Sequence, residues 1–143
     1  MINMFFKKNF LRVSITVFFL LITNQQNASE ILIYADKISY DQQNNIIAKG
    51  KAKILYENNI ISSDLIIYSQ TTGNITLPIE FSLKDQRNNY YYGSSGFFES
   101  NFELVEINDV KVLLEDGSRI VGKKIKRDHN IDVISKGVYS PCN

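Results

Sequence analysis

The amino-acid sequence predicts an all-β protein of antiparallel strands, and three observations carry this prediction. Residues 35–41 (Ala-Asp-Lys-Ile-Ser-Tyr-Asp) and 63–69 (Ser-Asp-Leu-Ile-Ile-Tyr-Ser) share the frame small-Asp-x-Ile-x-Tyr, 28 residues apart. Within each copy Asp, Ile and Tyr lie two positions apart, the period of a strand rather than of a helix. After residue 29 no segment shows apolar residues at helical spacing over ten or more positions, so we expect little or no helix.

The first half of the chain divides into strands and turns. We expect strands at 31–40, 46–56 and 60–68, joined by polar turns. In the second of these, small and apolar residues alternate with lysines, which predicts one apolar and one cationic face. The lysines are Lys49, Lys51 and Lys53. Turn residues recur about every 8–12 positions, the spacing of an all-β sandwich or barrel.

The second half continues in the same way. Pro78 lies inside an expected strand at 74–83, and since proline cannot donate to a ladder, we expect an edge or bulged strand there. Residues 93–96 (Gly-Ser-Ser-Gly) indicate a mobile connection, and Asp116-Gly117 indicates a tight hairpin turn. Further strands are expected at 97–98, 102–107, 110–114, 119–126 and 131–138.

The N-terminal segment is typical of a secretory signal peptide. Lys7, Lys8 and Arg12 precede an uncharged, largely apolar run at 13–23. That run is about half of the roughly 20 residues that span a bilayer, which favours a signal peptide over an uncleaved anchor. We therefore expect a signal peptide at residues 1–29, with the anchor as the alternative and the cleavage site undetermined, and one β domain at 30–143.

Composition and spacing argue against enzymes and nucleic-acid binding. The chain carries 16 basic and 15 acidic residues, and no aromatic residues are interleaved with the lysine row, so no nucleic-acid partner is expected. His129 is the single histidine, which excludes the usual zinc sites and catalytic triads. Asp36 and Asp64 occupy equivalent repeat positions, so a shared structural role, such as accepting backbone N–H bonds at a strand bend, is favoured over acid–base chemistry. No glycine-rich phosphate loop is present, and we predict neither enzyme activity nor a cofactor or metal.

The remaining possibility is that the apolar interior of the fold binds a ligand. Large and small side chains alternate on the face expected to point inward. This pattern fits both a closed sandwich core and two sheets held apart around a ligand, so both interpretations stay open. The inward residues are Ile38, Tyr40, Ala48, Ala52, Ile54, Tyr56, Ile66 and Tyr68.

The repeat resembles the OstA-type N-terminal domain of the lipopolysaccharide transport proteins. The matching elements are residues 35–41, Ala-Lys-Gly at 48–50, residues 63–68 and Thr-Gly at 72–73. Residues 126–128 (Lys-Arg-Asp) and 137–142 (Gly-Val-Tyr-Ser-Pro-Cys) further resemble the end of the periplasmic domain of LptD. The chain departs from the family pattern at Ser63, Ser69 and residues 76–78.

The resemblance implies an OstA-like β-jellyroll, an open sandwich that shelters lipid A acyl chains and passes lipopolysaccharide toward the outer membrane. It implies a periplasmic protein associated with the outer membrane, paired by its edge strands with an LptA-like bridge protein, and with an LptE-like protein or a β-barrel as a further partner. The residues implied in lipid binding are Ile38, Tyr40, Ile54, Tyr56, Ile66 and Tyr68.

Cys142 is the single cysteine, so its disulfide partner would lie in another chain or in sequence that is absent here. The resemblance implies a bridge toward the barrel of an LptD-like protein. Two alternatives remain: an exported interaction protein with a closed core, and an inactive truncated LptD.

Overall fold

The computed structural model describes residues 30–100, 102, 104–129 and 131–142. Within these residues the chain forms twelve strands in one antiparallel sheet and no helix, which confirms the predicted fold class. The strands are β1 (Ile31–Tyr34), β2 (Lys37–Tyr40), β3 (Asn45–Tyr56), β4 (Asn59–Ser69), β5 (Ile75–Leu77), β6 (Phe81–Lys84), β7 (Tyr90–Gly93), β8 (Ser95–Phe98), β9 (Leu104–Leu113), β10 (Arg119–Asp128), β11 (Ile131–Ser135) and β12 (Val138–Ser140).

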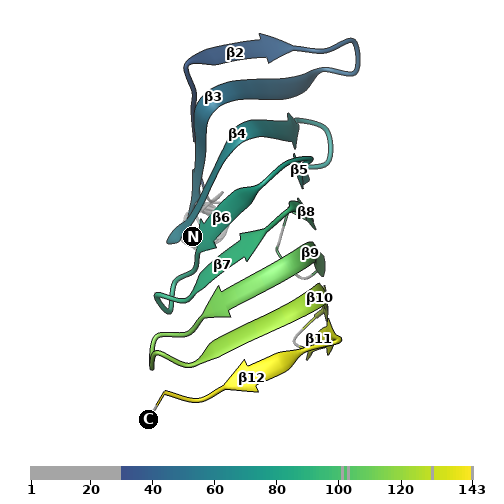
Figure 1. The fold of residues 1–143 in the computed structure, drawn as a ribbon. Coiled ribbons are helices and arrows are strands. Elements are labelled where there is room, and N and C mark those ends of the chain that lie inside the picture. The colour runs from purple at the N-terminus through teal and green to yellow at the C-terminus, as the bar shows by residue number, and fades with distance from the viewer. Residues whose placement is uncertain (1–29, 101, 103, 130, 143) are drawn as a thin grey trace, which may run out of the picture.

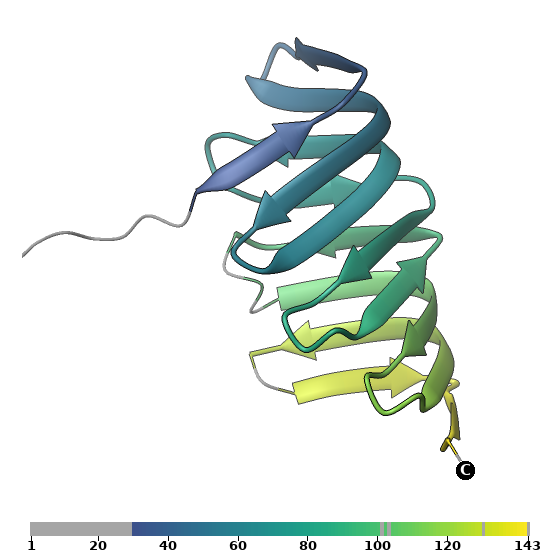
Figure 2. The same ribbon diagram turned by 90° about the vertical axis from the view of Figure 1, so that its left-hand side faces the viewer.

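The sheet is folded into two layers because each long strand pairs with different neighbours along its two halves. In β3, residues 53–56 pair with β1 and residues 46–49 pair with β2. The same division holds for β4, β9 and β10. Layer A has the order β1-β3-β4-β6-β7-β9-β10-β12, and layer B the order β2-β3-β4-β5-β8-β9-β10-β11. Figures 1 and 2 show the strands stacked from the N-terminal pair, β1 and β2, to the C-terminal pair, β11 and β12.

The two layers join along one side, where each long strand bends. In β3 the register shifts between Lys49 and Ala52, and Gly50 (φ 77°) and Lys51 (φ 46°) both adopt left-handed conformations. This is a β-bulge, which bends a strand. The carboxylate of Asp64 accepts the N–H of Lys51 at 3.2 Å, as expected for an acceptor at a strand bend. Asp36 reaches the same bulge from the other side, donating its N–H to the carbonyl of Gly50 at 2.9 Å.

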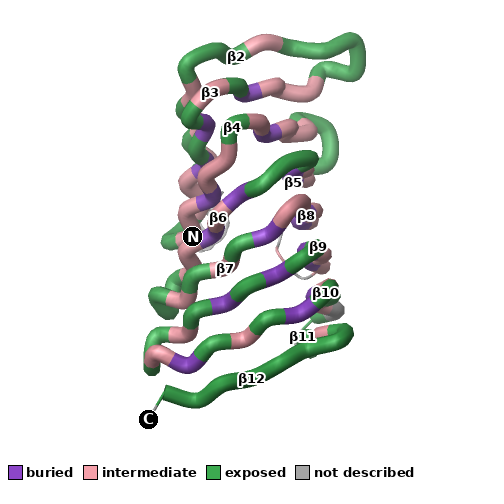
Figure 3. Tube along the Cα trace, viewed as in Figure 1, coloured by how far each residue is buried: buried purple, intermediate pink, exposed green. Residues whose placement is uncertain are grey.

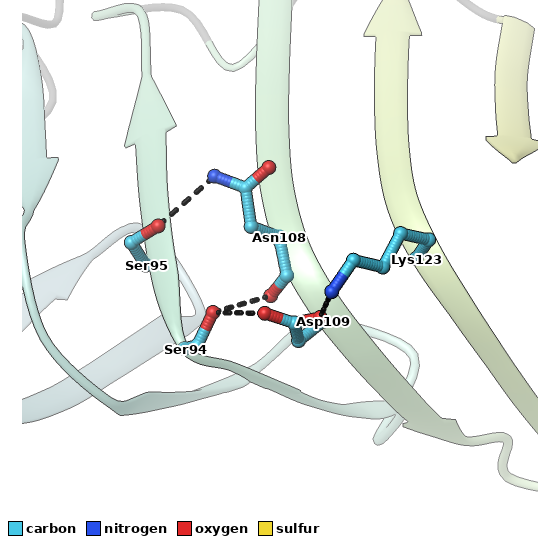
Figure 4. Close-up of polar contacts among 5 residues, drawn as sticks. All are labelled: Ser94, Ser95, Asn108, Asp109 and Lys123. Carbon is cyan, nitrogen blue, oxygen red and sulfur yellow. Dashed lines mark hydrogen bonds and ion pairs between the residues drawn. The ribbon is translucent and has the colours of Figure 1, made fainter.

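The line of bends continues through the later strands (Figure 4). Ser94, between β7 and β8, donates its hydroxyl to Asp109 at 2.8 Å, and Asp109 forms an ion pair with Lys123 of β10. Asn108 donates its side-chain amide to Ser95 at 2.9 Å. The segment 93–96, predicted as a mobile connection, therefore belongs almost wholly to β7 and β8. Its glycines are needed because a Cβ at Gly93 would lie 2.5 Å from Ile107.

Three expected strands are each two strands in different layers. The segment 31–40 divides at residues 35–36, and the segment 131–138 divides at 136–137. The segment 74–83 divides around Pro78, and its parts β5 and β6 each have two neighbours. Of the two expectations for this segment, an edge strand or a bulged strand, the edge strand was therefore wrong. Proline has no N–H for a ladder, and the chain uses this position to pass from layer B to layer A. The hairpin at Asp116-Gly117 is confirmed, with Gly117 at φ 83°.

The core is formed by buried residues from strands of both layers, and these alternate with less buried residues along the strands (Figure 3). In β3 the residues Ala48, Ala52 and Ile54 are buried while the neighbouring lysines are exposed, which confirms the predicted alternation. The bend places Lys49 on the outside of layer B and Lys53 on the outside of layer A. The largest fully buried side chains are Phe98, Ile54, Ile61, Ile66, Ile75, Leu77, Ile107 and Val110.

Candidate functional site

The space between the layers opens along the side opposite the bends. A cavity of about 740 Å³ lies there, within the range of about 300–1,000 Å³ typical of small-molecule sites. Layer A and the hairpins attached to it contribute apolar and aromatic side chains from Tyr56, Leu83, Tyr91 and Leu114. Layer B and the β8–β9 connection contribute Phe98, Phe102, Val105, Ile107 and Ile125. We call this space the side cavity.

An aromatic cluster spans the side cavity from one layer to the other. The ring of Phe102 stacks on Tyr56 of layer A with a centroid distance of 5.5 Å, and it contacts Phe98 of layer B at the same distance. Phe98 also meets Phe81 edge to face at 5.8 Å. Phe102 lies in the β8–β9 connection at φ 58°, and its N–H donates to the carbonyl of Glu99 at 2.9 Å. With this backbone conformation and hydrogen bond, the ring of Phe102 points inward and forms part of the cavity wall.

The mouth of the side cavity is polar, with hydrogen-bonded groups from both layers. In layer A the Tyr91 hydroxyl donates to Asp85 at 3.3 Å. In layer B Arg127 donates two hydrogen bonds to Asp132, at 2.7 and 2.9 Å. Burial raises the pKa of Tyr91 and the charge of Asp85 adds to this, while the positive charge of Arg127 opposes it. The hydrogen bonds to Asp132 raise the pKa of Arg127. At neutral pH Tyr91 is therefore neutral and Arg127 charged.

A second opening lies at the N-terminal end of the stack, between β1 and β2. This end cavity measures about 470 Å³. Five of its seven lining residues are aliphatic or aromatic residues of the first three strands. The lining residues are Ile31, Ile33, Ile38, Tyr40, Ile46, Tyr68 and Gln70.

The six residues implied in lipid binding fall into three places. Ile38, Tyr40 and Tyr68 line the end cavity, and the side chains of Ile38 and Tyr40 are 47% and 64% exposed. Tyr56 lines the side cavity. Ile54 and Ile66 are completely buried in the core between the two openings and line neither cavity. The interior is thus packed near its centre, as in a closed sandwich core. It is open at its side and end, as in two sheets held apart around a ligand.

Sequence reasoning missed the residues of the later strands that form most of the side cavity. The available signal was the group of phenylalanines at 97, 98 and 102, which the repeat in the first half of the chain does not include. His129 lies at the same mouth. Across the described residues no group of three or more His, Cys, Asp or Glu could hold a metal ion.

Cys142 has an exposed free thiol close to the β9–β10 hairpin, where a Cβ added to Gly117 would lie 3.0 Å from its sulfur. The expected signal peptide lies outside the described residues. In the part of the chain that the structure describes, no helix is long and apolar enough to cross a membrane.

The two bent layers around an apolar interior define a β-jellyroll. No family model and no curated protein matches the sequence. Among solved structures, the fold is similar to that of LptH from Pseudomonas aeruginosa, the LptA-homologous periplasmic component of the lipopolysaccharide transport device. The sequences are 18% identical, the TM-score is 0.62, and the match covers 74% of this chain and 82% of LptH. At this identity the likeness shows a shared fold.

Proposed function

We propose that the chain is a periplasmic lipopolysaccharide-transport domain, similar to the N-terminal domain of LptD, that holds lipid A acyl chains between its two layers. The observation that carries the proposal is the side cavity, with apolar walls from both layers and a polar mouth. The shared fold with LptH supports it. In this proposal residues 1–29 are a signal peptide, and the domain acts in the periplasm beside the outer membrane.

The physical basis is the cost of exposing hydrocarbon to water. Each methylene gains about 0.8 kcal/mol on leaving water, so an acyl chain of about a dozen carbons costs on the order of 10 kcal/mol to expose. Apolar side chains such as Phe98, Phe102 and Ile125 offer that chain a dry wall, while Arg127 and Asp85 keep the mouth hydrated. A lipid can therefore cross an aqueous compartment with its tails covered and its headgroup in water.

The ends of the stack support transfer between domains. β1 and β2 at one end, and β11 and β12 at the other, each have a strand partner on one side within the described residues. Both ends expose apolar side chains, including Ile38 and Tyr40 at one and Ile131 and Val138 at the other. Open edges of this kind add strands from another protein. We propose an LptA-like bridge protein as that partner, and an LptD barrel or an LptE-like protein as the partner near Cys142.

Photo-crosslinking in the periplasm of a lipopolysaccharide-producing bacterium tests the proposal. A benzophenone side chain at Phe102 or Tyr68 should capture lipopolysaccharide, because each residue lines a cavity. The same group at Lys49, on the outside of layer B, is the control and should capture none. Equal capture at Lys49 and Phe102 would contradict the proposal.

The second candidate is an exported interaction protein with a closed core, which the complete burial of Ile54 and Ile66 favours. It predicts no lipid capture at Phe102 and, on non-reducing electrophoresis, a dimer linked through Cys142. An inactive truncated LptD instead predicts normal growth after deletion of the gene while a full-length copy is present.

A further inference from the structure

The outer face of layer A carries two rows of side chains that run across all eight of its strands. Strand register places the members of each row side by side. The first row is Leu32, Leu55, Ile60, Lys84, Tyr90, Leu113, Arg119 and Ser140. The second row is Tyr34, Lys53, Ser62, Ser82, Tyr92, Lys111, Val121 and Val138. We call these sixteen residues the layer A face.

The layer A face combines positive charge with apolar surface. It holds three lysines and one arginine, and it contains no Asp or Glu. Within the described residues, none of these four cations forms an ion pair with an acid. Six aliphatic and three tyrosine side chains share the face, and several are well exposed, including Tyr34 (54%), Val121 (50%) and Val138 (69%).

Strand pairing sets each tyrosine of the face opposite a lysine. The pairs are Tyr34–Lys53, Tyr90–Lys84 and Tyr92–Lys111. The ammonium of Lys84 lies over the Tyr90 ring, 5.7 Å from its centroid. The interleaving of aromatic residues with lysines, which is absent along the sequence, is therefore present across the sheet. Tyrosine and lysine together suit an interface with a wet side and an apolar side.

We propose that the layer A face docks on the headgroup layer of a membrane that contains anionic phospholipids. The four cations complement the lipid phosphates, and the aliphatic side chains reach the boundary between headgroups and acyl chains. A second copy of the chain would bring four cations against four cations, which disfavours self-association through this face. A nucleic-acid backbone would leave the six aliphatic side chains without a function, because its contacts are polar.

Acidic residues around the layer A face determine how it can contact a membrane. Acidic residues flank it at the bends, among them Asp36, Asp64 and Asp109, and at the opposite turns, among them Glu57 and Glu115. Asp64 is bonded to the Lys51 N–H and Asp109 is paired with Lys123. These acids offset the positive charge of the face as seen from a distant membrane. Salt also screens charges that are separated by more than the Debye length of about 8–10 Å. Docking therefore depends on direct contact of the two rows with the membrane rather than on long-range steering.

A fluorescent probe on each outer face of the full-length protein tests this. Ser82→Cys carries an environment-sensitive fluorophore on the layer A face, and Thr76→Cys carries it on the outside of layer B, both with Cys142→Ser. We expect the Ser82 probe to shift to shorter wavelength with vesicles of phosphatidylcholine and phosphatidylglycerol, and neither probe to shift with phosphatidylcholine alone. Equal shifts at both positions would overturn the proposal, because attachment would not be through this face.

Charge variants give the second measurement. Lys53→Gln with Lys111→Gln should weaken vesicle binding at the Ser82 probe on the order of 30-fold, given about 1 kcal/mol per lysine near an anionic surface. Lys37→Gln with Lys49→Gln, on the outside of layer B, changes net charge equally and should leave binding unchanged. Unchanged binding in the first variant overturns the proposal. A response to heparin alone as strong as that to vesicles also overturns it, in favour of a soluble polyanion.

Discussion

The backbone N–H of Lys51 donates to the carboxylate of Asp64, 3.2 Å away, at the point where β3 and β4 pass from one layer to the other. Asp64 is the second copy of the repeated aspartate, and Asp36, the first copy, lies against the same bulge. The repeat in the sequence therefore marks the bend of the sheet rather than a chemical site.

Removing this acceptor should destabilise the bend. We expect Asp64→Ala to lower the free energy of unfolding by about 0.5–1.5 kcal/mol, the typical net value of one hydrogen bond. Asp64→Asn keeps an acceptor oxygen, so its free energy of unfolding should fall by less. Equilibrium urea denaturation measures both, and equal losses would show that the hydrogen bond to Lys51 is not the cause.

A methyl group at Gly96 should overpack the core. A Cβ there would lie 2.8 Å from Cε1 of Phe81 and 3.1 Å from Phe98, so Gly96→Ala should cost about 1–3 kcal/mol. In the Phe81→Leu background the nearest ring atoms are gone, and the same substitution should cost less. The comparison is a double-mutant cycle in urea, and an equal cost in both backgrounds would contradict the clash.

The ion pairs of Glu106 should make stability depend on acid pH. A hydrogen bond from Lys124, at 2.8 Å, holds the pKa of Glu106 below its ordinary value of 4.5, with Lys126 adding to this. A carboxyl group with a depressed folded-state pKa stabilises the protein above its ordinary pKa and loses that contribution as pH falls through the folded-state value. We therefore expect Glu106→Gln to lose less stability than the native chain between pH 5 and pH 3, measured by urea denaturation at each pH. An identical decline in both would rule out this ion pair as a source of the dependence.

The polar mouth of the side cavity should control entry of apolar ligands. Arg127→Gln removes the positive charge that layer B places at the mouth, paired with Asp132 and near Tyr91 of layer A, so the mouth becomes less polar. We expect faster uptake of an apolar fluorescent dye such as N-phenyl-1-naphthylamine in stopped-flow measurements. Arg87→Gln, at the same mouth, is the control for charge alone, and equal acceleration in both variants would contradict the role of Arg127.

The sequence predicted the fold class and the alternation within strands, because a period of two and recurring turns are local signals. It indicated a strand bend at the repeated aspartates, but it did not predict that the bends divide the sheet into two layers. A run such as 31–40 keeps its strand character through the corner at residues 35–36, and only pairing with two different halves of β3 shows that it divides. The side cavity was missed for a related reason, since Phe102 and Tyr56 meet only after the layers face each other.

The bends carry one more consequence. All strand pairing in the described residues runs within a layer or through the bends, and the facing edges across the mouth are held by side chains alone, such as Phe102 on Tyr56. Between the described strands, no ladder hydrogen bond joins the two layers across the mouth, so widening the angle between them would separate side chains only. A bulky ligand in the side cavity would displace aromatic rings such as Phe102, and the strand pairing within each layer would be unchanged.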